Sequence, residues 1–152
     1  MNDTTARISA IEDKLAIKNL VDTFSILADR KDVANQVFLL AENATVQSRV
    51  NGQLGEVLTG RKQVSDAFGP YLSSYETVYH SNGQQTVHLN GDKATAISYC
   101  TVTLIGAENG SKMKTVMGVV FNDELVKENE QWLIAKRITN FVWQETTPFI
   151  QQ

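Results

Sequence analysis

The chain has 152 residues, of which 42% are apolar and 20% are charged, and its formal net charge is −3. This length suits one domain with its own hydrophobic core, and the composition is that of a globular protein rather than a disordered one. The negative charge argues against nucleic-acid binding, which needs a basic stripe to neutralise phosphates. Cys100 is the only cysteine, which excludes an intrachain disulfide and a cysteine-built zinc site.

Targeting and membrane signals are missing from the sequence. Residues 1–7 are polar, and no apolar signal-peptide core follows them. No apolar run approaches the roughly 20 residues that a transmembrane helix needs. We therefore expect a cytoplasmic protein with no membrane partner.

The first third of the chain predicts helices. Apolar residues recur every three or four positions over residues 17–28, the period of an amphipathic helix, and residues 8–15 extend the pattern backwards. Asp32 is placed to cap a second helix that closes near Asn43.

A short strand and a third helix come next. Residues 45–50 alternate apolar and polar side chains, and Asn51-Gly52 predicts a hairpin turn directly after them. The apolar spacing over residues 61–75 predicts a helix that Gly69-Pro70 should break or kink.

The second half of the chain predicts a four-stranded antiparallel meander. Each run is rich in β-branched and aromatic residues, and the three turns between them are short and polar. The runs cover residues 78–89, 94–105, 113–126 and 132–145. Helices followed by a meander indicate an α+β fold. We expect a single domain over residues 1–152: a cone-shaped, curved antiparallel sheet wrapped around the N-terminal helices and enclosing an apolar pocket.

Few residues in this pattern point to chemistry. A glycine-rich phosphate loop, a nucleophile elbow and paired metal-binding histidines are all missing, so we expect neither a cofactor nor a metal. His80 opens a strand and precedes a polar break at residues 81–83 that has the character of a bulge, a feature common beside active sites. The alternative is a partly exposed histidine at the sheet edge. His88 alternates with apolar neighbours and is assigned to solvent.

Asp29 and Arg137 are the charged candidates. Asp29 lies off the apolar face of the first helix, so it is either a solvated helix end or, if the helix stops there, a cavity residue. Lys136 and Arg137 point to opposite faces of the sheet, so one of them faces the core side. An inward cation needs a partner, and arginine suits a buried carboxylate better than lysine does; a surface salt bridge is the alternative.

Over almost its whole length the sequence resembles the SnoaL-like division of the nuclear-transport-factor-two-like superfamily, which includes scytalone dehydratase, bile-acid dehydratase and hexachlorocyclohexane dehydrochlorinase. The segments that carry this resemblance are residues 17–32, 79–82, 120–124 and 132–137.

The resemblance implies roles for individual residues. In these enzymes an aspartate near the end of the first helix pairs with a histidine from the first long strand, and these positions are Asp29 and His80 here. The histidine abstracts a proton from carbon while the carboxylate orients it. Arg137 falls where the dehydrochlorinase has an arginine for the departing anion. Phe24 stands where the family has a tyrosine or a lysine, so that polar helper is missing. Tyr99 and Thr101 are assigned to the substrate pocket as possible sources of a hydroxyl.

Three functions follow from these assignments. The first is a cofactor-independent lyase, of the dehydratase or dehydrohalogenase type, acting on a small, mostly apolar ring compound. The second is a non-catalytic domain of the same fold that binds a small hydrophobic ligand or mediates oligomerisation, which the phenylalanine at position 24 favours. The third is a ketosteroid-isomerase-like isomerase, which would use a carboxylate base opposite a hydroxyl group.

The last two strands also predict self-association. We assign Val119, Phe121, Phe141 and Trp143, or their strand neighbours, to the outer face of the sheet, where they form more apolar surface than a monomer leaves in water. We therefore expect a homo-oligomer packed sheet to sheet, with a trimer favoured over a dimer.

Overall fold

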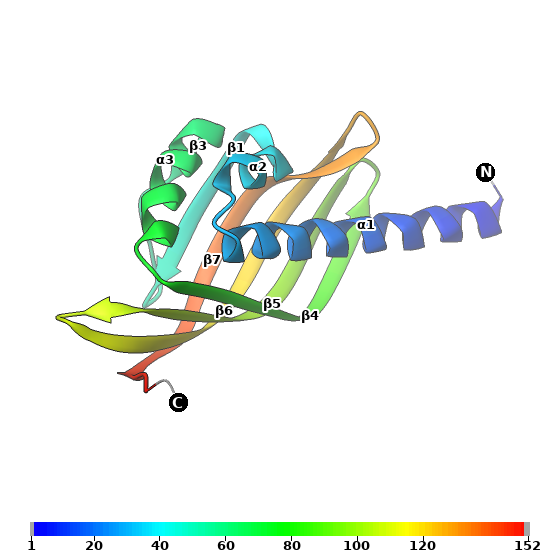
Figure 1. Cartoon of the computed structure of the whole chain (residues 1–152). Coiled ribbons are helices and arrows are strands. Elements are labelled where there is room, and N and C mark those ends of the chain that lie inside the picture. Colours follow the sequence, from blue (N-terminus) through cyan, green and yellow to red (C-terminus); the bar gives the residue numbers. More distant parts are fainter. Residues whose placement is uncertain (1, 151–152) are drawn as a thin grey trace.

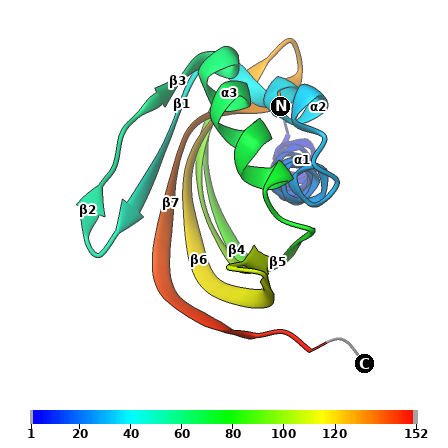
Figure 2. The same ribbon diagram turned by 60° about the vertical axis from the view of Figure 1, so that its left-hand side comes forward.

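The computed structural model describes residues 2–150 and shows helices on the concave side of one curved sheet (Figures 1 and 2). The helices are α1 (Asp3–Asp29), α2 (Val33–Gln36), the 3-10 turn η1 (Val37–Leu39) and α3 (Gly60–Ser73). The strands are β1 (Leu40–Val50), β2 (Gln53–Leu54), β3 (Leu58–Thr59), β4 (Thr77–Asn90), β5 (Lys93–Glu108), β6 (Ser111–Glu128) and β7 (Gln131–Pro148).

The sheet has the order β2-β1-β7-β6-β5-β4, and β3 pairs with β1 away from this path. The meander β4 to β7 is antiparallel as predicted, whereas β1 runs parallel to β7. Asn51 and Gly52 both have positive φ, at 52° and 78°, as the predicted tight turn requires. The predicted α+β fold is confirmed: long twisted strands curl around the helices that cover one face.

Two helix boundaries differ from the prediction. The capped second helix does form, since the Asp32 carboxylate accepts from the Asn35 backbone N–H, but it ends at Gln36 and the chain enters β1 at Leu40 rather than near Asn43. Helix α3 continues through Pro70 to Ser73 instead of breaking. The preceding residue, Gly69, explains this. The ring of a proline normally clashes with the Cβ of the residue before it when that residue is helical, and glycine has no Cβ.

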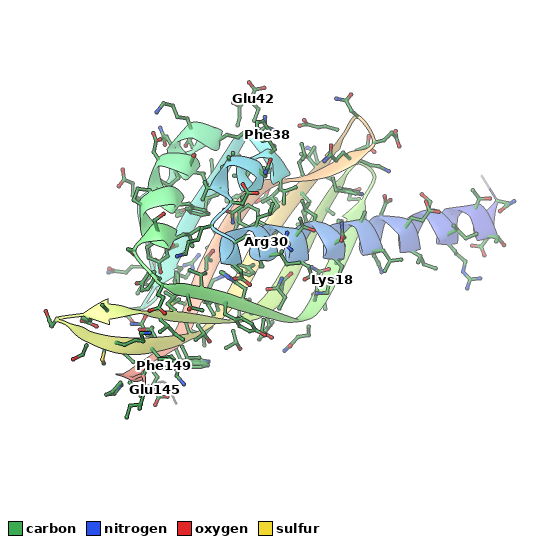
Figure 3. The ribbon with its side chains drawn as sticks, viewed as in Figure 1. Lys18, Arg30, Phe38, Glu42, Glu145 and Phe149 are labelled. Atoms are coloured by element: carbon green, nitrogen blue, oxygen red, sulfur yellow. The ribbon has the colours of Figure 1, made fainter. Side chains whose placement is uncertain are left out.

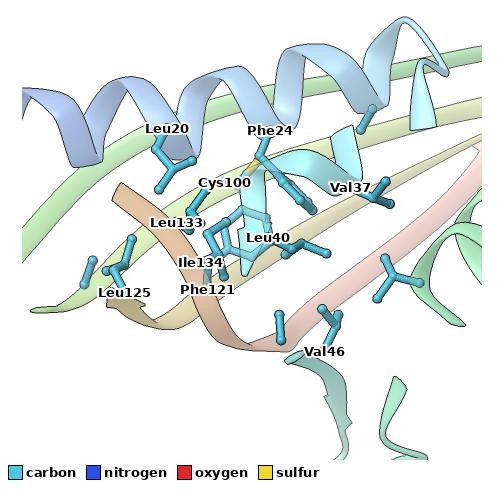
Figure 4. Close-up of a cluster of buried hydrophobic side chains, with 14 of the residues drawn as sticks. Leu20, Phe24, Val37, Leu40, Val46, Cys100, Phe121, Leu125, Leu133 and Ile134 are labelled. Carbon is cyan, nitrogen blue, oxygen red and sulfur yellow. The ribbon is translucent and has the colours of Figure 1, made fainter. Parts of the chain in front are cut away.

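The core lies between α1 and the concave face of the sheet. Figure 4 shows Phe24 reaching from α1 toward Leu40 and Phe121. Only the second half of α1 takes part, because its buried residues begin at Ile17. The first half is mostly exposed and extends past the sheet (Figure 3), although the Asp13 carboxylate accepts from the Lys127 ammonium group and the Trp132 indole N–H.

The predicted outer face needs correction. Val119 and Phe121 are buried on the concave side, and Phe141 packs against the same core. Only Trp143 is outside, because a register shift between β6 and β7 inserts Val142 and reverses the alternation beyond it. The outer face still carries exposed apolar side chains, but from a different set: Tyr79, Ile97, Tyr99, Val142 and Trp143.

Candidate functional site

A cavity of about 380 Å³ lies between α1, α3 and the concave face of β4 to β7. Its walls are mainly apolar side chains, including Phe24, Phe68, Leu104, Met117 and Phe121. This size and lining are typical of sites for small molecules. A few polar groups reach the same wall, and they determine what the cavity can do.

Asp29 reaches this wall because α1 stops there. The backbone N–H of Lys31 bonds to Ala28 O and that of Asp32 to Leu27 O, which is the hydrogen-bond pattern of a Schellman end. Lys31 takes the left-handed conformation, with φ of 57°, that glycine usually supplies. Its ammonium group donates to the backbone carbonyl of Tyr75, which ties the helix end to the start of β4. Asp29 is therefore the last residue of the helix and not a solvated part of it.

His80 comes to the same place from β4. It pairs with Val102 of β5, so its side chain lies on the concave face with Val78 and Leu104. The predicted bulge is present, because the register shifts between Asn82 and Gln85. The extra residue keeps both Asn82 and Gln85 on the inner side of the strand.

The two side chains meet at hydrogen-bond distance. His80 Nδ1 lies 2.7 Å from Asp29 Oδ1, and the side chains are 14% and 26% exposed. A carboxylate only accepts hydrogen bonds, so Nδ1 carries a proton, and in the neutral form of the ring the lone pair is on Nε2. A histidine held in this tautomer on the wall of an apolar cavity can take a proton from a bound molecule.

Asn82 fixes the helix against this strand, a role that no sequence pattern predicted. Its amide donates to Asp22 Oδ1 at 2.9 Å, and its carbonyl accepts from the Ser25 hydroxyl at 3.2 Å. Lys18 in turn donates to the same Asp22 carboxylate. These contacts hold α1 in register with β4, and the position of Asp29 relative to His80 depends on that register.

Arg137 lies inside the protein, 3% exposed, and lines the cavity. Its Nε and Nη2 atoms donate to Asp123 at 2.8 and 2.9 Å, and the Asp123 side chain is fully buried. The guanidinium carbon lies 3.9 Å from the ring centroid of Phe121 and 4.8 Å from that of Phe24. Among the described residues, none accepts from Nη1. Asp123 thus neutralises the cation and leaves one donor group for a ligand.

Of the other residues predicted to line the pocket, one does and two do not. Phe24 lines the cavity as expected. Tyr99 and Thr101 do not, and the prediction was wrong for both. Cys100 and Val102 are the inward residues of β5, so their neighbours point outward, and Tyr99 and Thr101 instead border a shallow depression of about 210 Å³ on the outer face. His88 is exposed, as assigned.

Three further groups near the cavity were not predicted. Gln36 and Tyr71 both line it. Burial, with a smaller effect of the neighbouring Tyr75, raises the pKa of Tyr71 to about 12, so its hydroxyl stays neutral at physiological pH. Burial likewise raises the pKa of the Cys100 thiol to about 11, which leaves it a poor nucleophile. Helical spacing alone predicted Tyr71 as an apolar-face residue, and nothing in the sequence marked Gln36.

Within residues 2–150, no three histidine, cysteine, aspartate or glutamate side chains gather closely enough to hold a metal ion. The helices in this part of the chain are also too short or too polar to cross a bilayer.

Several solved structures of other proteins share this fold. A scytalone dehydratase-like protein from Novosphingobium aromaticivorans superimposes with a TM-score of 0.78 at 16% identity, over 96% of this chain and 93% of that one. A hexachlorocyclohexane dehydrochlorinase of type 2 gives 0.80 at 14% identity, over 96% of both chains. A protein of unknown function from Mycobacterium tuberculosis gives 0.74 at 20% identity, over 93% of this chain and 76% of that one.

These solved structures share the fold at low sequence identity. No curated protein sequence matches the chain. The sequence model of the SnoaL-like domain matches residues 9–138, which include every residue that lines the cavity except Thr139 and Phe141. The chain therefore belongs to the SnoaL-like domain family.

Proposed function

We propose that the protein is a cofactor-independent lyase of the dehydratase or dehydrohalogenase type that acts on a small, mostly apolar ring compound. The observation that carries the proposal is the 2.7 Å contact between His80 and Asp29 on the wall of the apolar cavity. The fold alone would not suffice, because one fold hosts many functions.

The reaction needs one base and one leaving group. His80 Nε2 takes a proton from a substrate carbon, and the electrons of that C–H bond form a double bond to the adjacent carbon. The leaving group departs from that carbon with its bonding electrons. Asp29 stabilises the imidazolium that results. The imidazolium then gives its proton to a departing hydroxide, forming water, or to solvent when the leaving group is a halide.

Arg137 is the residue placed to receive the leaving group, through Nη1. Because Asp123 already pairs with the guanidinium, Arg137 offers a directed hydrogen-bond donor rather than a free positive charge. Phe24 adds no donor or acid from α1. We therefore expect a substrate with a good leaving group or an acidic C–H bond.

The compound 5-nitrobenzisoxazole meets both conditions and tests the base directly. Removal of its ring C–H proton breaks the N–O bond and releases a coloured nitrophenolate. The wild-type protein should accelerate this elimination, and His80→Ala should lower the rate about 10²–10⁴-fold, the usual contribution of one positioned base. Asp29→Asn should also slow the reaction, because an asparagine no longer fixes the histidine tautomer.

His88→Ala is the matched control, because it removes an exposed histidine from the same strand. It should leave the rate unchanged. If His80→Ala turned over the probe as fast as the wild-type protein does, the lyase proposal would be refuted and a ligand-binding function would take its place.

A further inference from the structure

Gln36 is an unusual member of the cavity wall. It comes from the single turn of α2, between the end of α1 and the start of β1, and it is only 1% exposed. The same cavity is lined by apolar residues that include Phe24, Ala28 and Val46. A methionine or leucine of similar size would fill the same space without bringing an amide group out of water.

The amide has a defined orientation. Nε2 donates to the backbone carbonyl of Phe24 at 3.1 Å. A carbonyl can only accept, so the nitrogen must face Phe24 O and the oxygen must face away from it. Oε1 is buried, and within the described residues it has no hydrogen-bond partner; it is also the sole buried side-chain nitrogen or oxygen there with none. A buried acceptor without a donor destabilises the folded state, so the group calls for an explanation.

We infer that Gln36 Oε1 is a specificity-determining acceptor, and that the ligand of the cavity is a mostly apolar molecule with a hydroxyl group that donates to it. Phe24 connects this acceptor to the rest of the site. Its carbonyl holds the Gln36 amide, while its ring lies 4.8 Å from the Arg137 guanidinium carbon.

This inference rests on the proposed function only in taking a small molecule as the occupant of the cavity. It requires binding and not turnover. The apolar walls supply affinity for any ring compound of suitable size, whereas Gln36 selects among such compounds, because an acceptor left unpaired penalises a ligand that cannot donate.

The test uses 2-naphthol and 2-methylnaphthalene, which differ only by a hydroxyl in place of a methyl group, with binding measured by equilibrium dialysis. Gln36→Met removes the acceptor and keeps the side-chain length. It should weaken 2-naphthol binding and strengthen 2-methylnaphthalene binding, which changes the ratio of their dissociation constants about tenfold, the usual effect of one hydrogen bond. Gln53→Met is the control, because Gln53 is an exposed residue of β2 and does not border the cavity. It should leave the ratio unchanged.

A second measurement uses the wild-type protein alone and does not depend on how well the variant folds. The compound 2-methoxynaphthalene can accept but not donate a hydrogen bond, so it should bind more weakly than 2-naphthol. Equal binding of these two compounds would overturn the inference. So would an unchanged ratio in Gln36→Met, which is also the result expected if a buried water were the only partner of Oε1. If the protein discriminates these ligands yet leaves 5-nitrobenzisoxazole intact, the lyase proposal fails and this inference stands.

Discussion

Arg137 and Asp123 form an ion pair that is almost completely removed from water, and its disruption makes a quantitative prediction. Two hydrogen bonds of 2.8 and 2.9 Å join the groups, and the side chains are 3% and 0% exposed. Arg137→Met keeps a long side chain between the rings of Phe24 and Phe121 but leaves the Asp123 carboxylate buried without a counter-charge. Breaking such a pair costs about 3–5 kcal/mol of unfolding free energy.

The neighbouring pair on the same two strands provides the control. Lys136 and Glu124 lie 3.7 Å apart, but their side chains are 46% and 60% exposed. Lys136→Met should therefore cost only about 0–1 kcal/mol. At about 2–4 °C per kcal/mol for a chain of this size, Arg137→Met should lower the melting temperature by about 6–20 °C, whereas Lys136→Met should hardly move it.

The double variant Arg137→Met with Asp123→Leu separates charge from packing. Replacing both partners of a buried pair by apolar residues is often neutral or stabilising, so the double variant should recover most of the lost stability. Urea unfolding of the wild-type protein, the two single variants and the double variant gives four unfolding free energies, from which the coupling energy between the two side chains follows. A double variant that is less stable than Arg137→Met alone would refute the reasoning, because the loss would then come from packing and not from the stranded carboxylate.

Three further predictions concern other parts of the molecule. Burial raises the pKa of Cys100 from 9.0 to about 11, so the folded protein holds this proton more tightly than the unfolded chain does. Stability should therefore fall as pH rises between these two values, and a Cys100→Ala variant should lack this component in urea titrations across that range. We propose that the exposed Tyr99 and Trp143 belong to a sheet-to-sheet interface between copies of the chain. Light scattering should then give about three times the 16.9 kDa chain mass, and Trp143→Asp should dissociate the oligomer. A monomeric wild-type mass would contradict the interface. A Cβ at Gly118 would lie 2.0 Å from Trp143 Nε1, so Gly118→Ala should displace the indole and shift its fluorescence; an unchanged emission spectrum would show that the ring does not lie against β6.

The sequence predicted the fold well because its main signals are local. Apolar spacing placed α1, and polar turns separated the four long strands. The outer face was misassigned because no sequence pattern fixed which face of β6 and β7 is concave, so Val119, Phe121 and Phe141 lie inside. A strict two-residue period also contains no sign of the inserted Val142, which alone places Trp143 outside. The continuation of α3 through Pro70 was missed for a related reason: the effect of a proline depends on its neighbour, here Gly69.

For the site, the sequence indicated the charged residues better than their partners. Arg137 was expected to need a carboxylate if it faced inward, but that this carboxylate is Asp123 follows from the register of β6 against β7. Tyr99 and Thr101 were misassigned because nothing fixed which face of β5 is concave. Gln36 could not be predicted, because it stands out only through the missing hydrogen-bond partner of Oε1. A missing partner can be recognised only when the positions of all surrounding atoms are known.

The contacts between α1 and β4 make the candidate site a reporter of local unfolding. Asp29 meets His80 across 51 positions of sequence, and Asn82 joins the same two elements through Asp22 and Ser25. These are mostly half-buried polar contacts, whereas long backbone hydrogen-bond ladders join the strands of the sheet. A local opening at the C-terminal end of α1, which leaves the core face from Ile17 to Phe24 in place, would separate the base from its orienting carboxylate and open the cavity to water in one step. Loss of chemistry on heating would then precede loss of the sheet.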